Sequence, residues 1–429
     1  MFKFIKSLCE DAWLKLVQSF WLFFSYFLSQ IGIQAINMVT GFLIIRAMTK
    51  DDYANYTIIN TLGPVMLMLS DNGIGTGMSA IGRRIWQDNE KTGRLVSTAM
   101  KLRRKFALVS FILIAPLLAW MLFRNHAPVL TIVLLTVVTV TGVSFQLTGA
   151  VMNTILGLRQ QLKIMARVGM TSAFFRLCLV AVFAVVFHIN AFLATLAGTC
   201  AVILETYFLV RSVKPQILWD APPDPDYRAT IFSLVWKTMP LTVYFCVQGQ
   251  ISIWLISIFG SAHQVADIGA AGRLGVIFTT VASSFCAITI PRFARNNGRH
   301  RLFVQVLQII LTLMLMLATF VVFTSLFPGP FIMLLGAKYA NMSGLIWLVV
   351  LSSGLNTLAG TIFGLNISKG WIPPAMLTIP IEIITQIVLL LTLNLSKTEN
   401  VLIFSCLTAI PPIIVNTLIL LRRIRLEAE

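Results

Sequence analysis

The sequence predicts an all-α polytopic membrane protein with about twelve transmembrane helices in two six-helix bundles. Its 429 residues are 57% hydrophobic and only 11% charged, with a mean hydropathy of +0.86, whereas soluble domains carry about 25% charged residues. The apolar runs are 18 to 29 residues long, enough for a helix to cross the hydrocarbon layer. They do not alternate as the strands of a membrane barrel do. Helices therefore satisfy the backbone hydrogen bonds in the membrane.

The apolar runs place the spans in order along the chain. We expect them near residues 17–45, 54–81, 106–123, 128–157, 165–187, 190–210, 231–259, 265–290, 303–327, 342–366, 371–394 and 400–421. The first span is too long for a signal-peptide core, so we expect it to remain in the mature protein. Residues 1–16 mix aromatic residues with lysines, which predicts a cytoplasmic segment lying in the membrane interface.

Basic residues are distributed unequally between the two sides of these spans. With the amino terminus inside, 26 of the 33 Lys and Arg residues fall on the cytoplasmic side and five on the other. This asymmetry follows the positive-inside rule. It predicts a multi-pass protein of the bacterial inner membrane with both termini in the cytoplasm. The net charge of +17 is therefore an orientation signal, and no nucleic-acid partner is expected.

A polar, proline-containing stretch divides the spans into six and six. We expect an N-terminal bundle at residues 17–211, a cytoplasmic linker at 212–230, a C-terminal bundle at 231–421 and a cytoplasmic tail at 422–429. Both halves open with a span, a short turn and a helix that ends in arginines, so the halves enter the membrane in the same sense. Parallel repeats of this kind place a substrate site between two bundles.

Few ionisable residues lie inside the spans, and each costs about 2.5–3.5 kcal/mol to insert. Arg176 lies at the centre of the fifth span, and we expect it to face a cavity where its guanidinium can bind a phosphate. Arg273 and Glu382 lie at similar predicted depth in the C-terminal half. They either pair with each other or serve a substrate (Arg273) and ion coupling (Glu382).

Asp71 interrupts the second span and is followed by three glycines at alternate positions. This pattern predicts a kinked or unwound helix with close packing. Asp71 then either caps the break or couples a cation. Prolines inside several spans predict further kinks. The six cysteines and four histidines are scattered without metal-ligand spacing, so no metal, cofactor or catalytic group is expected.

The block from Pro240 to Arg295 resembles the seventh and eighth helices of polysaccharide-export flippases, the Wzx-type members of the multidrug/oligosaccharidyl-lipid/polysaccharide (MOP) superfamily, which have a MATE-like fold. In that family an early proline is followed by polar residues, a turn and a helix start with an arginine. The matching positions here are Pro240, Gln248 or Gln250, Gly260, the segment from Asp267 to Arg273, and Pro291. The segments from Arg46 to Asn55, from Asp71 to Gly77 and from Gly336 to Tyr339 are similar too.

One departure from the family concerns charge on the first and seventh helices. Family members often carry charged residues there, whereas this chain offers Gln30, Gln34, Asn37, Gln248 and Gln250. We expect Gln34, Asn37, Gln248 and Gln250 to contact sugar hydroxyls beside Arg176 and Arg273.

The resemblance implies a flippase that moves an undecaprenyl-pyrophosphate-linked oligosaccharide across the membrane by alternating access, for O-antigen, exopolysaccharide or capsule assembly. It also implies the lipid bilayer as environment, coupling to an H⁺ or Na⁺ gradient, and other polysaccharide-assembly proteins as partners. A cation-coupled multidrug exporter of the MATE type is the alternative. A membrane glycan polymerase or ligase is disfavoured because such enzymes resemble one another in having a long periplasmic loop with catalytic Arg or His, which this chain lacks.

Overall fold

The computed structural model describes residues 25, 28–248, 251–259, 261–296, 298–369, 371, 374–395 and 397–426. Within these residues every regular element is a helix, and no strand occurs. By its contacts the chain divides into two compact units. The first comprises residues 1–47, 59–120 and 128–246, and the second residues 48–58, 121–127 and 247–429.

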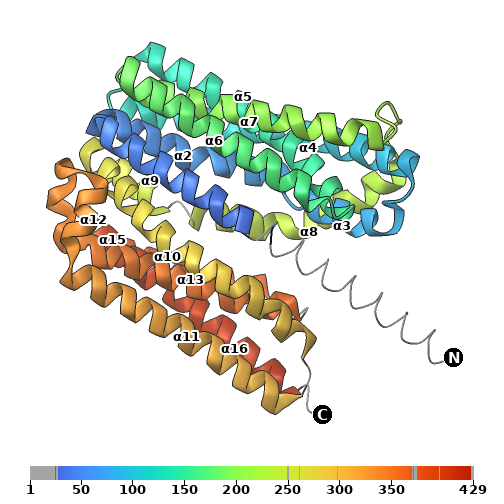
Figure 1. Cartoon of the computed structure of the whole chain (residues 1–429). Helices are drawn as coiled ribbons and strands as arrows, with labels where there is room; N and C mark the ends of the chain where they lie inside the picture. The colour runs from blue at the N-terminus through green and yellow to red at the C-terminus, as the bar shows by residue number, and fades with distance from the viewer. Residues whose placement is uncertain are drawn as a thin grey trace, which may run out of the picture. The chain divides into compact units, whose positions relative to one another are not determined.

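Within the described residues, each of the twelve predicted spans corresponds to one helix or to a pair of consecutive helices, most of which are labelled in Figure 1. The amino-terminal six are Leu28–Ala47, α2 with α3 (Lys50–Asp71, Ile74–Ile85), α4 (Asn89–Arg124), α5 (Val129–Leu158), α6 (Leu162–Val186) and α7 (Ala191–Val213). The others are α8 with α9 (Pro225–Gln248, Ile251–Phe259), α10 (Ala262–Arg295), α11 (Arg299–Leu326), α13 (Ile346–Ser368), α14 (Ala375–Thr392) and α15 with α16 (Thr398–Thr408, Ile410–Leu426). Short helices connect some of them: η1 (Lys214–Gln216), α12 (Pro328–Leu335) and η2 (Ala337–Leu345).

Nine helices among the described residues are long and apolar enough to cross a membrane. The three predicted spans outside this set are the second, the seventh and the eleventh. The second is divided into two helices, the seventh has undescribed residues between α8 and α9, and the eleventh supplies only a shorter apolar helix, Met376–Thr392.

The break in the second span lies directly after Asp71, as the glycine pattern predicts. Asn72 and Gly73 both have positive φ, at 34° and 83°. A left-handed residue ends an α-helix, and glycine adopts this conformation without the steric cost that a Cβ brings. The twelfth span breaks at Ala409, just before Pro411 and Pro412. Proline cannot donate a backbone hydrogen bond within a helix but is tolerated in a first turn.

In the first unit, α5, α6 and α7 pack side by side (Figure 1). Threonines of α7 cross to carbonyls of α5: Thr199 donates to Val138 and Thr206 donates to Phe145, at 3.3 and 3.0 Å. Opposite them α5 carries Gly142 and Gly149, where a Cβ would lie 2.9 and 3.1 Å from the threonine hydroxyls. Small residues thus allow the close approach that membrane helices use in place of a hydrophobic driving force.

The start of α4 is fixed by Asp88. Its carboxylate accepts hydrogen bonds of 3.0 Å from the backbone N–H groups of Lys91 and Glu90. These bonds, led by the one from Lys91, hold the pKa of this exposed carboxyl below its usual range, because they stabilise the charged form.

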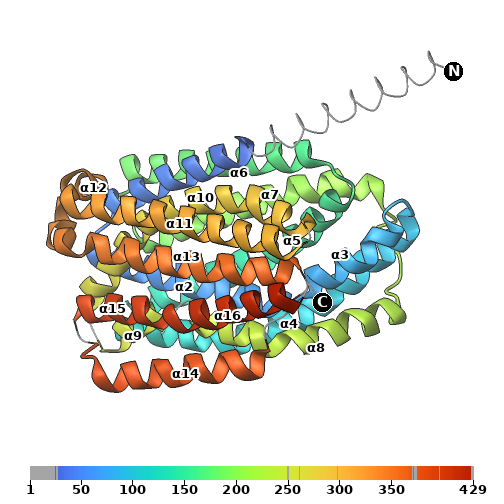
Figure 2. The same ribbon diagram turned by 90° about the horizontal axis from the view of Figure 1, so that it is seen from below.

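In the second unit, α13 packs against α10, α11 and α16 (Figure 2). Its core joins residues such as Phe278, Leu313, Leu317, Val350 and Leu420. The outer side of α11 instead exposes large apolar residues, including Leu311, Leu315 and Val322. An apolar exterior over long apolar helices is that of a multi-pass membrane protein.

Candidate functional site

A polar cavity of about 410 Å³ lies inside the first unit, between the first described helix and α5, α6 and α7. Its lining is rich in side chains that can form hydrogen bonds, which is unusual between helices as apolar as these. The polar lining consists of Gln30, Asn37, Gln146, Asn153, Ser172, Arg176 and Glu205. One cation, one anion and four amides therefore face one space.

Arg176 lies near the middle of α6, as the sequence predicted, and faces this cavity. Ser172 stands one turn earlier on the same face and donates a 3.0 Å hydrogen bond to the carbonyl of Ala201 on α7. The guanidinium lies against α7 at Gly198, where a Cβ would be 3.8 Å from Arg176 Nε. Glycine leaves room there for the guanidinium beside the α7 backbone.

Glu205 is one of four polar lining residues that the sequence analysis did not single out, with Gln146, Asn153 and Ser172. It lies seven residues after Gly198, which places the two on one face of α7, and Ser172 and Arg176 are four apart on α6. These spacings are the signal that could have found the pair. Arg176 and Glu205 share the cavity but form no direct ion pair within the described residues.

Asn37 lines the cavity, whereas Gln34 is exposed and lies outside the lining. Gln30 lies two helical turns before Asn37 and belongs to the lining too. Gln248 is the last residue of α8 and is half-buried. Gln250 lies outside the described residues.

Arg273 and Glu382 form no ion pair with each other, although the structure describes both side chains. Arg273 of α10 instead contacts the hydroxyls of Tyr53 and Tyr56 of α2. Glu382 is buried on α14. Thr378 and Gln386 are buried one turn to either side of it, so the three form a polar stripe on an otherwise apolar helix.

Asp71 forms an ion pair with Arg103 of α4. Arg103 is only 3% exposed and also donates a 2.9 Å hydrogen bond to the carbonyl of Leu147 on α5. The pair thus ties the helix break to two other helices of the first unit. The sequence analysis did not single out Arg103, which is one of several basic residues counted before the third predicted span.

A second polar group, which we call the Asp267 cluster, lies in the second unit. Buried Asp267 accepts hydrogen bonds of 2.9 Å from Lys50 and from Asn341. Lys50 and Lys338 each lie about 5 Å from the ring centre of Tyr339, which suits cation–π attraction. Lys338 also donates to the carbonyl of Met48. Its members come from three distant segments, in α2, α10 and η2, so their proximity could not be predicted from the sequence.

No family model matches the chain, and no curated protein matches its sequence. Solved structures do match. An inward-facing multidrug resistance MATE family transporter of the MOP superfamily aligns with a TM-score of 0.74 at 15% identity, over 92% of this chain and 95% of that one. The lipid II flippase MurJ, in an inward closed conformation, aligns with a TM-score of 0.71 at 13% identity, over 94% and 87%.

A MOP superfamily transporter from Pyrococcus furiosus aligns with a TM-score of 0.65 at 14% identity, over 94% of this chain and 95% of that one. At these identities the similarity shows the fold. The chain has the fold of MATE and other MOP transporters, and the predicted fold class is confirmed.

Proposed function

We propose that this protein is a flippase that moves an undecaprenyl-pyrophosphate-linked oligosaccharide across the bacterial inner membrane. The observation that carries the proposal is the polar cavity of the first unit, with Arg176 and four amides in its lining. A guanidinium binds phosphate oxygens through paired hydrogen bonds, and amides can both donate to and accept from sugar hydroxyls. The lipid tail remains in the bilayer.

Glu205 gives this cavity a means of coupling to protons. A carboxylate beside a pyrophosphate would repel it unless a proton neutralised one of the two. Uptake of a proton by Glu205 would therefore accompany loading of the anion. The cavity would return to its resting charge when both leave.

A cation-coupled multidrug exporter is the second candidate, and Glu205 is the observation that favours it. An acid in a cavity attracts a lipophilic cation. The similar structures include a protein of each kind, because one is described as a multidrug transporter and another as a lipid II flippase. The two candidates differ in the role of Arg176. A guanidinium attracts a pyrophosphate and repels a cationic drug.

Purified protein in proteoliposomes would separate these candidates. The first probe is a fluorescent polyprenyl-pyrophosphate disaccharide, whose flipping is measured by access to a membrane-impermeable quencher, and the second is ethidium efflux under a pH gradient. For the flippase, Arg176→Ala lowers the flipping rate by about 100-fold, the loss expected when a bidentate charged contact worth about 3 kcal/mol is removed. Arg176→Lys restores part of the rate because it keeps the charge but not the paired geometry.

The matched control is Arg167→Ala. Arg167 is an exposed residue of the same helix outside the cavity lining, so its loss leaves flipping unchanged. Ethidium efflux that survives Arg176→Ala and disappears in Glu205→Gln, with no flipping of the glycolipid by the wild type, would establish the exporter instead.

A further inference from the structure

α4 is much longer than a membrane crossing requires. Its 36 residues extend about 54 Å at 1.5 Å per residue, against a hydrocarbon layer of about 30 Å. The apolar part begins after Lys105, and Lys101, Arg104 and Lys105 are exposed just before it. These cations therefore lie at the depth of lipid headgroups.

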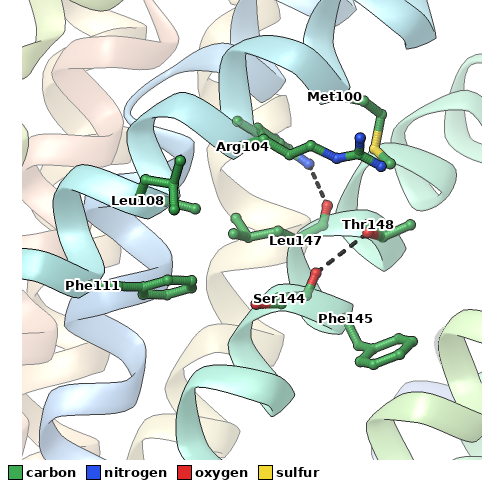
Figure 3. Close-up of a pocket in the computed structure, with 10 residues that line it drawn as sticks. Met100, Arg104, Leu108, Phe111, Ser144, Phe145, Leu147 and Thr148 are labelled. Carbon is green, nitrogen blue, oxygen red and sulfur yellow. Dashed lines mark hydrogen bonds between the residues drawn. The ribbon is translucent and has the colours of Figure 1, made fainter. Parts of the chain in front are cut away.

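A groove of about 460 Å³ runs between α4 and α5 from this depth into the apolar part of the helices (Figure 3). Leu108, Phe111 and Phe145 form its apolar walls. Leu108 is 62% exposed. The hydroxyls of Ser144 and Thr148 donate hydrogen bonds to carbonyls of their own helix, α5. Their protons are therefore not available to a ligand, and the groove is mainly apolar.

The two neighbouring arginines at the end of the groove have different surroundings. Arg103 is buried and held by Asp71 and the Leu147 carbonyl. Arg104 is exposed and extends over the groove toward Met100 and Thr148 (Figure 3). It forms no ion pair with any described residue. The groove thus has an available cation at its headgroup end and apolar walls below.

We propose that this groove binds an anionic phospholipid, with the phosphate on Arg104 and an acyl chain along Leu108, Phe111 and Phe145. Basic pockets between helices at the membrane surface recognise anionic headgroups. A soluble anion would gain nothing from the apolar walls, and a zwitterionic lipid would bring no net charge to the guanidinium. The lipid supports the α4–α5 face, which holds the Asp71–Arg103 pair on its inner side. The inference does not depend on what the protein transports.

The test uses the full chain in phosphatidylcholine nanodiscs containing a small fraction of phosphatidylglycerol with a photo-reactive acyl chain. Labelled peptides are located by mass spectrometry, and photo-reactive phosphatidylcholine gives the reference. We expect phosphatidylglycerol to label the peptides of residues 106–111 and 144–148 about fivefold more than phosphatidylcholine, since one basic residue near the surface contributes about 1 kcal/mol.

Three variants separate the headgroup from the groove. Arg104→Gln brings the ratio of the two lipids to about one. Ser144→Trp, at an exposed position of the wall, fills the groove and removes labelling by both. Arg211→Gln, the same change at an exposed arginine of α7 outside the lining, leaves the ratio unchanged.

Equal labelling by the two lipids in the wild type would overturn the proposal, as would a ratio that persists in Arg104→Gln. A ratio abolished by millimolar inorganic phosphate at constant ionic strength would overturn it too, because the recognised ligand would then be a soluble anion.

Discussion

The polar cavity of the first unit and the Asp267 cluster show two ways of keeping charge within a membrane protein. In the cavity, Arg176 and Glu205 face a common space without a direct ion pair. In the cluster, the Asp267 carboxylate is engaged on both oxygens, by Lys50 and by Asn341. A charge enclosed by its partners stabilises one arrangement of the helices, whereas a charge in the lining of a cavity is within reach of a ligand.

The Asp71–Arg103 pair belongs with the Asp267 cluster in this comparison. Arg103 is satisfied by a carboxylate and by a backbone carbonyl. The difference is that Asp71 is 36% exposed, so one of its oxygens remains open to solvent or to a cation. Asp71 is thus intermediate between the two regions.

The largest effect is expected from Asp267→Asn. Removing one member of a buried ion pair costs about 3–5 kcal/mol, and we expect the lower end of this range because the partner, Lys50, is 21% exposed. The variant should lose most of its monodisperse fraction on heating in detergent, measured by fluorescence-detected size-exclusion chromatography. Arg176→Ala should leave that melting profile near the wild-type one.

The double variant Asp267→Asn with Lys50→Gln tests the cause of the loss. If the ion pair is responsible, the double variant melts higher than Asp267→Asn alone. Equal or greater destabilisation would mean that Asp267 acts through Asn341 or through packing.

A smaller effect is expected at the helix break, where Asp71→Asn leaves Arg103 with the Leu147 carbonyl alone. The exposure of Asp71 reduces the Coulomb contribution through solvent screening, so we expect a cost of about 1–3 kcal/mol, the penalty for an unsatisfied buried donor. The double variant Asp71→Asn with Arg103→Leu should recover part of it.

Transport measured on the same Asp71 variants decides between the two roles that the sequence left open. A structural pair predicts that transport per folded molecule is retained in the double variant. Complete loss of gradient-driven transport in a well-folded Asp71→Asn protein would instead assign cation coupling to this carboxylate.

The smallest change in structure is expected from substitutions at Gly198, which sharpen the picture of the cavity. A Cβ there would make ordinary van der Waals contact with the Arg176 guanidinium, at 3.8 Å, so Gly198→Ala should fold and transport almost normally. Removing a helical glycine even adds about 0.5–1 kcal/mol of stability. Gly198→Leu would displace the guanidinium and should reduce transport about as much as Arg176→Ala.

Transport by Gly198→Leu at the wild-type rate, with the melting profile unchanged, would show that the position of the guanidinium does not matter to the substrate. The Gly157→Ala variant is the matched control. No atom lies within 4 Å of a Cβ at this α5 position, so both transport and folding should be retained.

The sequence by itself determined which segments form the long apolar helices and where the second predicted span breaks. These features depend on local properties, namely the length of an apolar run and the glycines that follow Asp71, which tolerate a left-handed backbone. It also placed Arg176 near the middle of one helix, because that position follows from the limits of a single apolar run.

Only the tertiary structure decided which polar side chains share a site. Glu205 and Arg176 line the same cavity. Asp71 pairs with Arg103, and Lys50 pairs with Asp267, which lies 217 positions away in the chain. Arg273 lies against Tyr53 and Tyr56, where equal predicted depth had suggested Glu382. Depth fixes one coordinate of a side chain in the bilayer. The direction in which the side chain points depends on how its helix is rotated against the neighbouring helices. That rotation is set by packing contacts, such as those of Gly142 with Thr199 and of Gly198 with Arg176.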